Sequence, residues 1–139
     1  MCIHTRREIL VLAASGAALL TAVPTLASDA ELFIAAAEQM RQQAVAAGDQ
    51  PYGAILVLNG NIIGFGPSRV VTDRNPDAHA ERIALWDAQR RLGANAIPGS
   101  VIYATSTPCS ICQKALAQAE VTRMYVGASG VDNGRPGAR

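Results

Sequence analysis

The stretch Gly53-Ala-Ile-Leu-Val-Leu-Asn-Gly-Asn-Ile-Ile-Gly-Phe65 predicts a β-hairpin, around which the other elements can be placed. Its first six residues form a continuous apolar run, which is typical of a buried strand. Asn59-Gly60 suits a type I′ turn, in which both central residues adopt positive φ. Residues 61–65 then return as the partner strand. We therefore expect a sheet that begins with a tight hairpin.

Helices and further strands are predicted on both sides of this hairpin. Ser28-Asp29-Ala30-Glu31 has the form of a capping box, so a helix should begin there and end at Gly48. A polar loop over residues 67–77 follows the hairpin. The remaining elements are a helix over 78–92, with Ile83 and Trp86 along one side, a strand over 101–105, a helix over 109–120 and a strand over 121–126. Helices of this length between strands require crossover connections, so we predict an α/β fold in which helices cover a sheet.

The two ends of the chain are predicted to lie outside this single domain of residues 28–127. Residues 1–27 have the pattern of an export signal, with Arg6-Arg7 before an uncharged run over 9–23 and a small-x-small motif that suits cleavage after Ala27. Residues 5–10 resemble a twin-arginine signal, which an exporter of folded proteins reads. The alternatives are a general secretory signal and an uncleaved anchor, but the run is shorter than the roughly 20 residues that span a bilayer. Residues 128–139 are rich in turn-forming residues and predict a flexible tail.

Charge and location narrow the range of partners. The export signal predicts a periplasmic or secreted protein with no stable membrane anchor. The whole chain of 139 residues carries a net charge of +1, and without residues 1–27 it holds ten basic and ten acidic residues. Proteins that bind nucleic acid usually show a clear excess of basic residues, so we expect no nucleic-acid partner. The same part of the chain retains one histidine and two cysteines.

These three residues, His79, Cys109 and Cys112, are candidate metal ligands. The cysteines are three positions apart at the start of a predicted helix, where the helix dipole favours thiolates. His79 lies at the start of another predicted helix. If the two helix starts meet at one edge of the sheet, they offer Zn²⁺ one nitrogen and two sulfurs, which leaves its fourth tetrahedral position open, as in catalytic sites. Glu81 follows two residues after His79, which places its carboxylate near the metal without making it a ligand.

A disulfide is the main alternative for the cysteine pair. A Cys-x-x-Cys motif alone in an exported protein is most often a structural or redox disulfide, and a His-x-Glu motif alone carries little information. Here both motifs open predicted helices, and Pro108 precedes the first cysteine. The disulfide reading leaves His79 and Glu81 without a role, so the combination favours zinc.

His-x-Glu followed by Pro-Cys-x-x-Cys is the signature of zinc nucleobase deaminases. The sequence resembles the zinc-dependent cytidine/deoxycytidylate deaminase superfamily, in its branch with the guanine, fungal-type cytosine and tRNA adenosine deaminases. The likeness covers nearly all of residues 30–127, including Pro51-Tyr-Gly-Ala54, Asn75 to Glu81, Gly99 to Thr105 and Arg123 to Gly127. The resemblance implies a three-layer α-β-α cytidine deaminase-like fold with a mixed sheet.

The resemblance also implies roles for individual residues. His79, Cys109 and Cys112 would bind Zn²⁺, and Glu81 would transfer a proton from the metal-activated water to a ring nitrogen and then to the departing amine. The reaction would replace an amino group of cytosine, adenine or guanine with a carbonyl and release ammonia. The substrate contacts implied in the same way are Ala54, Ser68, Ala80 and Pro108.

The sequence departs from the family pattern at several places. Ser68 occupies the position where the family commonly has an asparagine that contacts the base, and Thr107 replaces a glutamate before Pro-Cys. Asp77 replaces a threonine, which adds a second carboxylate near the metal. The family continues beyond the position of Gly127 with a further helix and strand, so we expect the C-terminal elements to be shortened here.

We therefore expect a zinc-dependent hydrolytic deaminase of a free nucleobase or nucleoside. Guanine-type activity is marginally favoured, because the resemblance is greatest there. The alternative is a catalytically decayed deaminase-fold protein that only binds zinc, which the short C-terminus favours and the retention of Glu81 opposes. The family often dimerises, so we expect a homodimer.

Overall fold

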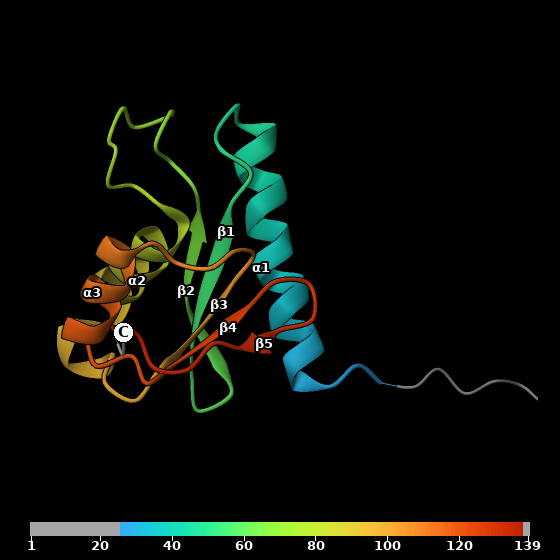
Figure 1. The fold of residues 1–139 in the computed structure, drawn as a ribbon, viewed down its shortest axis with the longest axis vertical. Helices are drawn as coiled ribbons and strands as arrows, with labels where there is room; N and C mark the ends of the chain where they lie inside the picture. The colour runs from blue at the N-terminus through green and yellow to red at the C-terminus, as the bar shows by residue number, and fades with distance from the viewer. Residues whose placement is uncertain (1–25, 138–139) are drawn as a thin grey trace, which may run out of the picture.

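The computed structural model describes residues 26–137 as a sheet with helices on both faces (Figure 1). The predicted export signal lies outside the described residues, except for Leu26 and Ala27. Within residues 26–137, no helix combines the length and the apolar character that crossing a membrane requires. The elements in chain order are α1 (Asp29–Ala46), β1 (Gly53–Leu58), β2 (Asn61–Pro67), α2 (Ala80–Leu92), a 3₁₀ turn (Ala94–Ala96), β3 (Val101–Ala104), α3 (Ser110–Gln118), β4 (Arg123–Val126) and β5 (Val131–Asp132).

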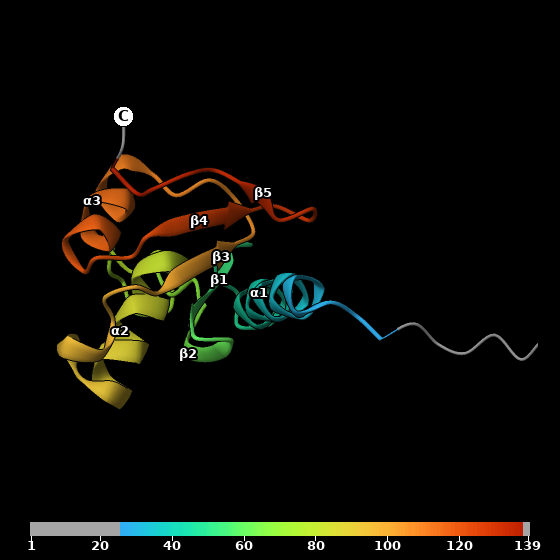
Figure 2. The same ribbon diagram turned by 90° about the horizontal axis from the view of Figure 1, so that it is seen from below.

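The sheet is mixed, with the strand order β2-β1-β3-β4-β5. The β1 strand pairs antiparallel with both β2 and β3, and β3 pairs parallel with β4. Figure 2 shows α1 on one face of the sheet and α2 and α3 on the other. This arrangement of the described residues confirms the predicted α-β-α layering, in which α2 and α3 connect strands on the same face.

Local sequence signals explain where the first elements begin and turn. The Ser28 hydroxyl accepts a hydrogen bond from the Glu31 amide at 3.3 Å, and the Glu31 carboxylate accepts one from the Ser28 amide at 2.7 Å. This confirms the predicted capping box. Asn59 and Gly60 have φ values of 49° and 77°, as a type I′ turn requires. The hairpin prediction is therefore confirmed down to the bounds of β1.

Two glycines allow α2 to lie very close to β2. A Cβ atom on Gly66 would lie 2.0 Å from the carbonyl oxygen of Ala80, and one on Gly64 would lie 2.1 Å from that of Ala84. The helix presents a buried row of alanines to these glycines, whereas Trp86 is 37% exposed on another side. Small residues on both surfaces thus fix the distance between β2 and α2, and with it the position of the N-terminus of α2.

The predicted flexible tail is wrong for residues 128–137. The β5 strand pairs antiparallel with β4, and the Met124 amide donates to the Gly134 carbonyl at 2.8 Å. Further on, the Gly137 amide donates to the side chain of Gln113 on α3 at 3.3 Å. Gly127 and Gly130 adopt positive φ and reverse the chain onto the free edge of β4. The turn-forming residues therefore build tight turns here.

Candidate functional site

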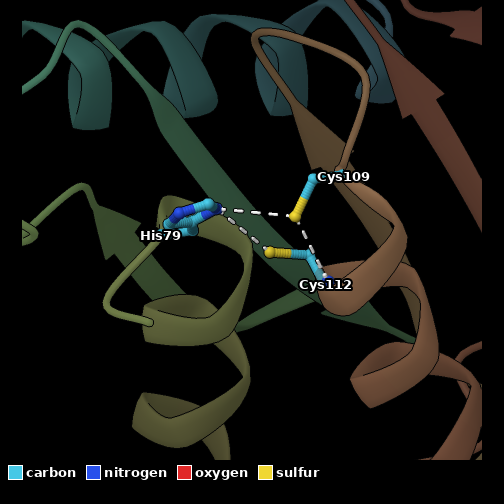
Figure 3. A group of neighbouring side chains, drawn as sticks. All are labelled: His79, Cys109 and Cys112. Atoms are coloured by element: carbon cyan, nitrogen blue, oxygen red, sulfur yellow. Dashed lines mark hydrogen bonds between the residues drawn. The ribbon is translucent and has the colours of Figure 1, made fainter. Parts of the chain in front are cut away.

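The starts of α2 and α3 bring the three predicted metal ligands together. His79 is the N-cap of α2 and Cys109 is the N-cap of α3, with Cys112 in the first turn of α3. Figure 3 shows the three side chains pointing toward one another from the two helix starts. The Nδ1 atom of His79 lies 3.6 Å from the sulfur of Cys109 and 3.4 Å from that of Cys112. The three candidate ligand atoms all lie within 4.8 Å of one another.

The two nitrogen–sulfur distances fit a zinc ion. With ordinary Zn–N and Zn–S bond lengths, a tetrahedral ion holds its nitrogen and sulfur ligands about 3.6 Å apart. The two measured nitrogen–sulfur distances agree with that value within about 0.2 Å. Cys109 and Cys112 are both free rather than joined in a disulfide. One nitrogen and two sulfurs leave one tetrahedral position for water or substrate, which is the composition of a catalytic zinc site.

The electrostatics of Cys112 also favour a cation at this point. Burial raises the pKa of the Cys112 thiol far above its usual range, and the nearby Glu81 carboxylate raises it further. The Cys112 thiolate would therefore require a positive charge beside it, and a metal ion bound at this point would supply one.

Glu81 is a buried carboxylate in the first turn of α2. It is 6% exposed and lies on the wall of the same pocket as His79. Burial raises the pKa of Glu81 above its usual value, and its own backbone amide and the neighbouring His79 only partly oppose this shift. A carboxyl group with a raised pKa can both accept and return a proton near neutral pH.

A pocket of about 480 Å³ opens beside these groups, within the size range of small-ligand pockets. Its lining residues are Gln50, Tyr52, His79, Ala80, Glu81, Ser106, Thr107 and Cys109. Of the described residues that line it, none is Lys or Arg. A second hollow of similar volume lies on the α1 face of the sheet, beside Tyr103 and Tyr125, but the candidate metal ligands do not line it.

Only one of the four predicted substrate contacts, Ala80, lines the pocket. Ala54 is fully buried in strand β1, and the Pro108 carbonyl accepts a hydrogen bond from the side chain of Gln113, which does not line this pocket. Ser68 is 2% exposed, and its hydroxyl donates to Asp49 at 2.9 Å. Ala54, Ser68 and Pro108 therefore do not line this pocket, and their contact with a substrate stays a prediction from the family resemblance.

Sequence reasoning missed Gln50, Ser106 and Asp49. Gln50 and Ser106 line the pocket but belong to none of the motifs that guided the prediction. The position of Asp49 could have indicated a structural or functional role, because it is an acidic residue between the end of a predicted helix and the Pro51-Tyr-Gly-Ala54 motif.

The fold and the site together define a deaminase-type domain with a candidate His-Cys-Cys metal site. The chain belongs to the family described as the cytidine and deoxycytidylate deaminase zinc-binding region, whose model matches residues 27–128. It is 34% identical over 102 residues to a tRNA-specific adenosine deaminase of Haemophilus influenzae, which covers 73% of this chain and 59% of that protein. It is 32% identical over 108 residues to a guanine deaminase of Bacillus subtilis, which covers 77% of this chain and 69% of that protein.

Solved structures agree with these sequence relationships. The X-ray structure of guanine deaminase from Bacillus subtilis matches with a TM-score of 0.66 at 33% identity, over 70% of this chain and 63% of that one. A structure from a study of tRNA:A34 deaminases matches with a TM-score of 0.68 at 30% identity, over 71% of this chain and 76% of that one. The cytidine deaminase-like fold and the family resemblance are thereby confirmed. The chain spans less than two thirds of the length of the first curated relatives that it matches.

Proposed function

We propose that the protein is a zinc-dependent hydrolytic deaminase that acts on a free nucleobase or nucleoside of guanine, cytosine or adenine type and releases ammonia. The observation that carries this proposal is the convergence of His79, Cys109 and Cys112 beside the buried carboxyl of Glu81 in one pocket. A site that only bound zinc would not need a buried acid at this position.

Each residue of the candidate site has a separate role in such a reaction. When bound, Zn²⁺ in a site with three protein ligands acts as a Lewis acid on a water molecule in the open position. His79, Cys109 and Cys112 hold the ion. Glu81 moves two protons in turn: it accepts the first from the attacking water and passes it to the ring nitrogen, and it then accepts the second from the newly added hydroxyl and passes it to the leaving amine. Burial of Glu81 keeps bulk water from competing for that proton.

The pocket wall favours a small neutral substrate over a polynucleotide. Tyr52 offers an aromatic face at the mouth of the pocket, where it is 43% exposed. Gln50, Ser106 and Thr107 offer neutral hydrogen-bonding groups of the kind that the edge of a base requires. The lack of Lys and Arg among these described residues gives a phosphate backbone no partner at the pocket. Some relatives act on tRNA, but we propose a free base or nucleoside for this chain.

Ammonia release tests this proposal. The full chain, loaded with zinc, would be incubated separately with guanine, cytosine, adenine and their nucleosides, and ammonia would be measured. We expect release from at least one of them, and we expect the Glu81→Gln variant to retain zinc and lose the activity. Stoichiometric zinc binding without ammonia from any substrate would instead identify a catalytically decayed zinc protein.

The location and assembly of the protein are separate proposals. We propose that residues 1–27 direct export by the twin-arginine route, so that the chain folds and binds metal before it reaches an oxidising compartment. Cell fractionation tests this, and an exported protein without zinc that carries a Cys109–Cys112 disulfide would refute it. We also propose a homodimer, as the family resemblance implies, which sedimentation of the full chain tests.

A further inference from the structure

A buried carboxylate lies behind the pocket wall and has no part in the chemistry described so far. Asp49 follows α1 and is 9% exposed. Its two oxygens accept five hydrogen bonds of 2.7–3.0 Å, from the amides of Gln50, Val71 and Thr72 and the hydroxyls of Ser68 and Thr72. Burial raises the pKa of Asp49, but these hydrogen bonds lower it by more, so its pKa lies well below the usual value. Asp49 is therefore an ionised anchor with nearly every acceptor position filled.

The hydrogen bonds of Asp49 join the two segments that build the site. On one side lies the connection between α1 and β1, which carries Gln50 and Tyr52 into the pocket wall. On the other side lie residues 68–72, where the loop that leads to His79 begins. The Ser68 amide also donates to the Tyr52 carbonyl at 3.0 Å, so the two segments are joined by backbone as well.

The loop from Ser68 to Ala78 is closed by its own hydrogen bonds. The Arg69 amide donates to the Ala78 carbonyl at 3.0 Å, and the Ala78 amide donates to the Asn75 carbonyl at 3.0 Å. Ala78 is fully buried and directly precedes His79. A shift of the start of the loop would therefore be transmitted to the candidate metal ligand at its end.

We propose that Asp49 is a positioning residue of the metal site, which fixes the 68–78 loop so that the His79 ring faces both cysteines. This inference rests on the proposed zinc binding but does not depend on deaminase activity. It also assigns Ser68 to the anchor network rather than to the base. Because metal ligands must lie within about 0.2 Å of their ideal distances, a small displacement of the loop would be measurable as a loss of affinity.

Metal affinity tests the inference, with stability controlled separately. The full-length Asp49→Asn variant keeps the size of the side chain but replaces one acceptor oxygen with a donor that faces other donors. We expect its zinc affinity, measured by competition with a chelator, to fall about tenfold, in the range known for groups that orient metal ligands. We also expect the visible spectrum of its Co²⁺ form to change, because that spectrum reports coordination geometry.

Two controls separate positioning from simple stabilisation. Asp73→Asn removes an exposed carboxylate on the same loop, where it pairs with Arg69 at 2.8 Å. Met40→Ala destabilises the core cluster on the α1 face, to which no residue of the 68–78 loop belongs. Both controls should bind zinc within about twofold of wild type at a temperature where circular dichroism shows them folded.

An Asp49→Asn variant that binds zinc as tightly as wild type, with an unchanged Co²⁺ spectrum, would overturn the inference. If that variant does not fold, Ser68→Ala combined with Thr72→Val removes two hydroxyl donors to Asp49 and leaves the backbone donors in place. We expect a threefold to fivefold loss of zinc affinity, of the order expected for weakened outer hydrogen bonds, and no loss would equally overturn the inference. A wild-type chain that binds zinc but releases no ammonia would refute the proposed function and leave this inference standing.

Discussion

Replacing Gly66 by alanine should disturb the candidate metal site by displacing the N-terminus of α2. The new Cβ would lie 2.0 Å from the Ala80 carbonyl oxygen and 2.6 Å from the Ala84 amide nitrogen. Such contacts hardly ever fall below about 3.0 Å, so strand and helix must separate by about 1 Å. Ala80 lies between His79 and Glu81, so this displacement reaches a candidate metal ligand and the candidate proton carrier directly.

The expected size of the effect follows from two opposing terms. Overpacking of this kind costs about 1–3 kcal/mol, whereas the loss of glycine flexibility in the unfolded chain returns about 0.4–1 kcal/mol. We expect the free energy of unfolding to fall by about 1–2 kcal/mol. We expect zinc affinity to fall at least tenfold and turnover up to about 100-fold, because a misplacement of 1 Å can cost that much in rate.

Gly64→Ala is the matched control for this prediction. Its Cβ would lie 2.1 Å from the Ala84 carbonyl oxygen and 2.9 Å from the Ala88 side chain, one turn further along the same helix. Urea unfolding and chelator competition would be measured on both variants. Similar losses of stability with a much larger loss of zinc affinity for Gly66→Ala would support the reasoning. Equal losses of zinc affinity would refute it, because α2 would then move as a rigid unit.

Three further predictions concern the site itself. Glu81→Gln should lower turnover by about 10²–10⁴-fold and leave zinc content unchanged. Burial raises the pKa of Glu81, which means that its ionised form destabilises the fold. The zinc-free variant should therefore unfold at pH 7 no more easily than zinc-free wild type. A chelator should lower the melting temperature, since zinc at 1,000 times its dissociation constant stabilises the folded state by about 4 kcal/mol; no shift on chelation would argue against a metal held by His79, Cys109 and Cys112. Because the pKa of Asp49 is lowered in the folded state, its ionised form stabilises the fold above about pH 4, and this stabilisation is lost as the pH falls below that value. The difference in the free energy of unfolding between wild type and Asp49→Asn should therefore shrink between about pH 5 and 2. A constant difference would contradict the assignment.

The sequence was informative wherever local chemistry determines structure. The bounds of β1, the Asn59-Gly60 turn and the capping box at Ser28 all follow from interactions between near neighbours, and all three are confirmed. The grouping of His79 with Cys109 and Cys112 could also be predicted, because the motifs are specific and both open helices.

The sequence was less informative where distant residues meet. Ser68 was predicted to contact the base, and only the structure shows that its hydroxyl donates a hydrogen bond to Asp49, 19 positions earlier. Residues 128–137 were predicted to be flexible because their composition is rich in turn-forming residues. That composition gives no sign of the free edge of β4, with which β5 pairs. The buried side of α2 is a row of alanines, which carries a weaker pattern than the partly exposed Trp86 on another side. In each case a partner far along the chain decides the outcome.

The candidate metal ligands come from two successive crossover units, which has a consequence for folding kinetics. His79 and Cys109 are 30 positions apart, so their contact is non-local, and it requires β3, which leads into α3, to lie beside β1 in the sheet. Closing such non-local contacts is a slow, late event in folding. A metal that needs all three ligands then stabilises the native state more than the transition state, so it should slow unfolding and leave the folding rate nearly unchanged. Zinc would in that case determine how long the folded chain persists, while the hairpin and sheet determine how fast it forms.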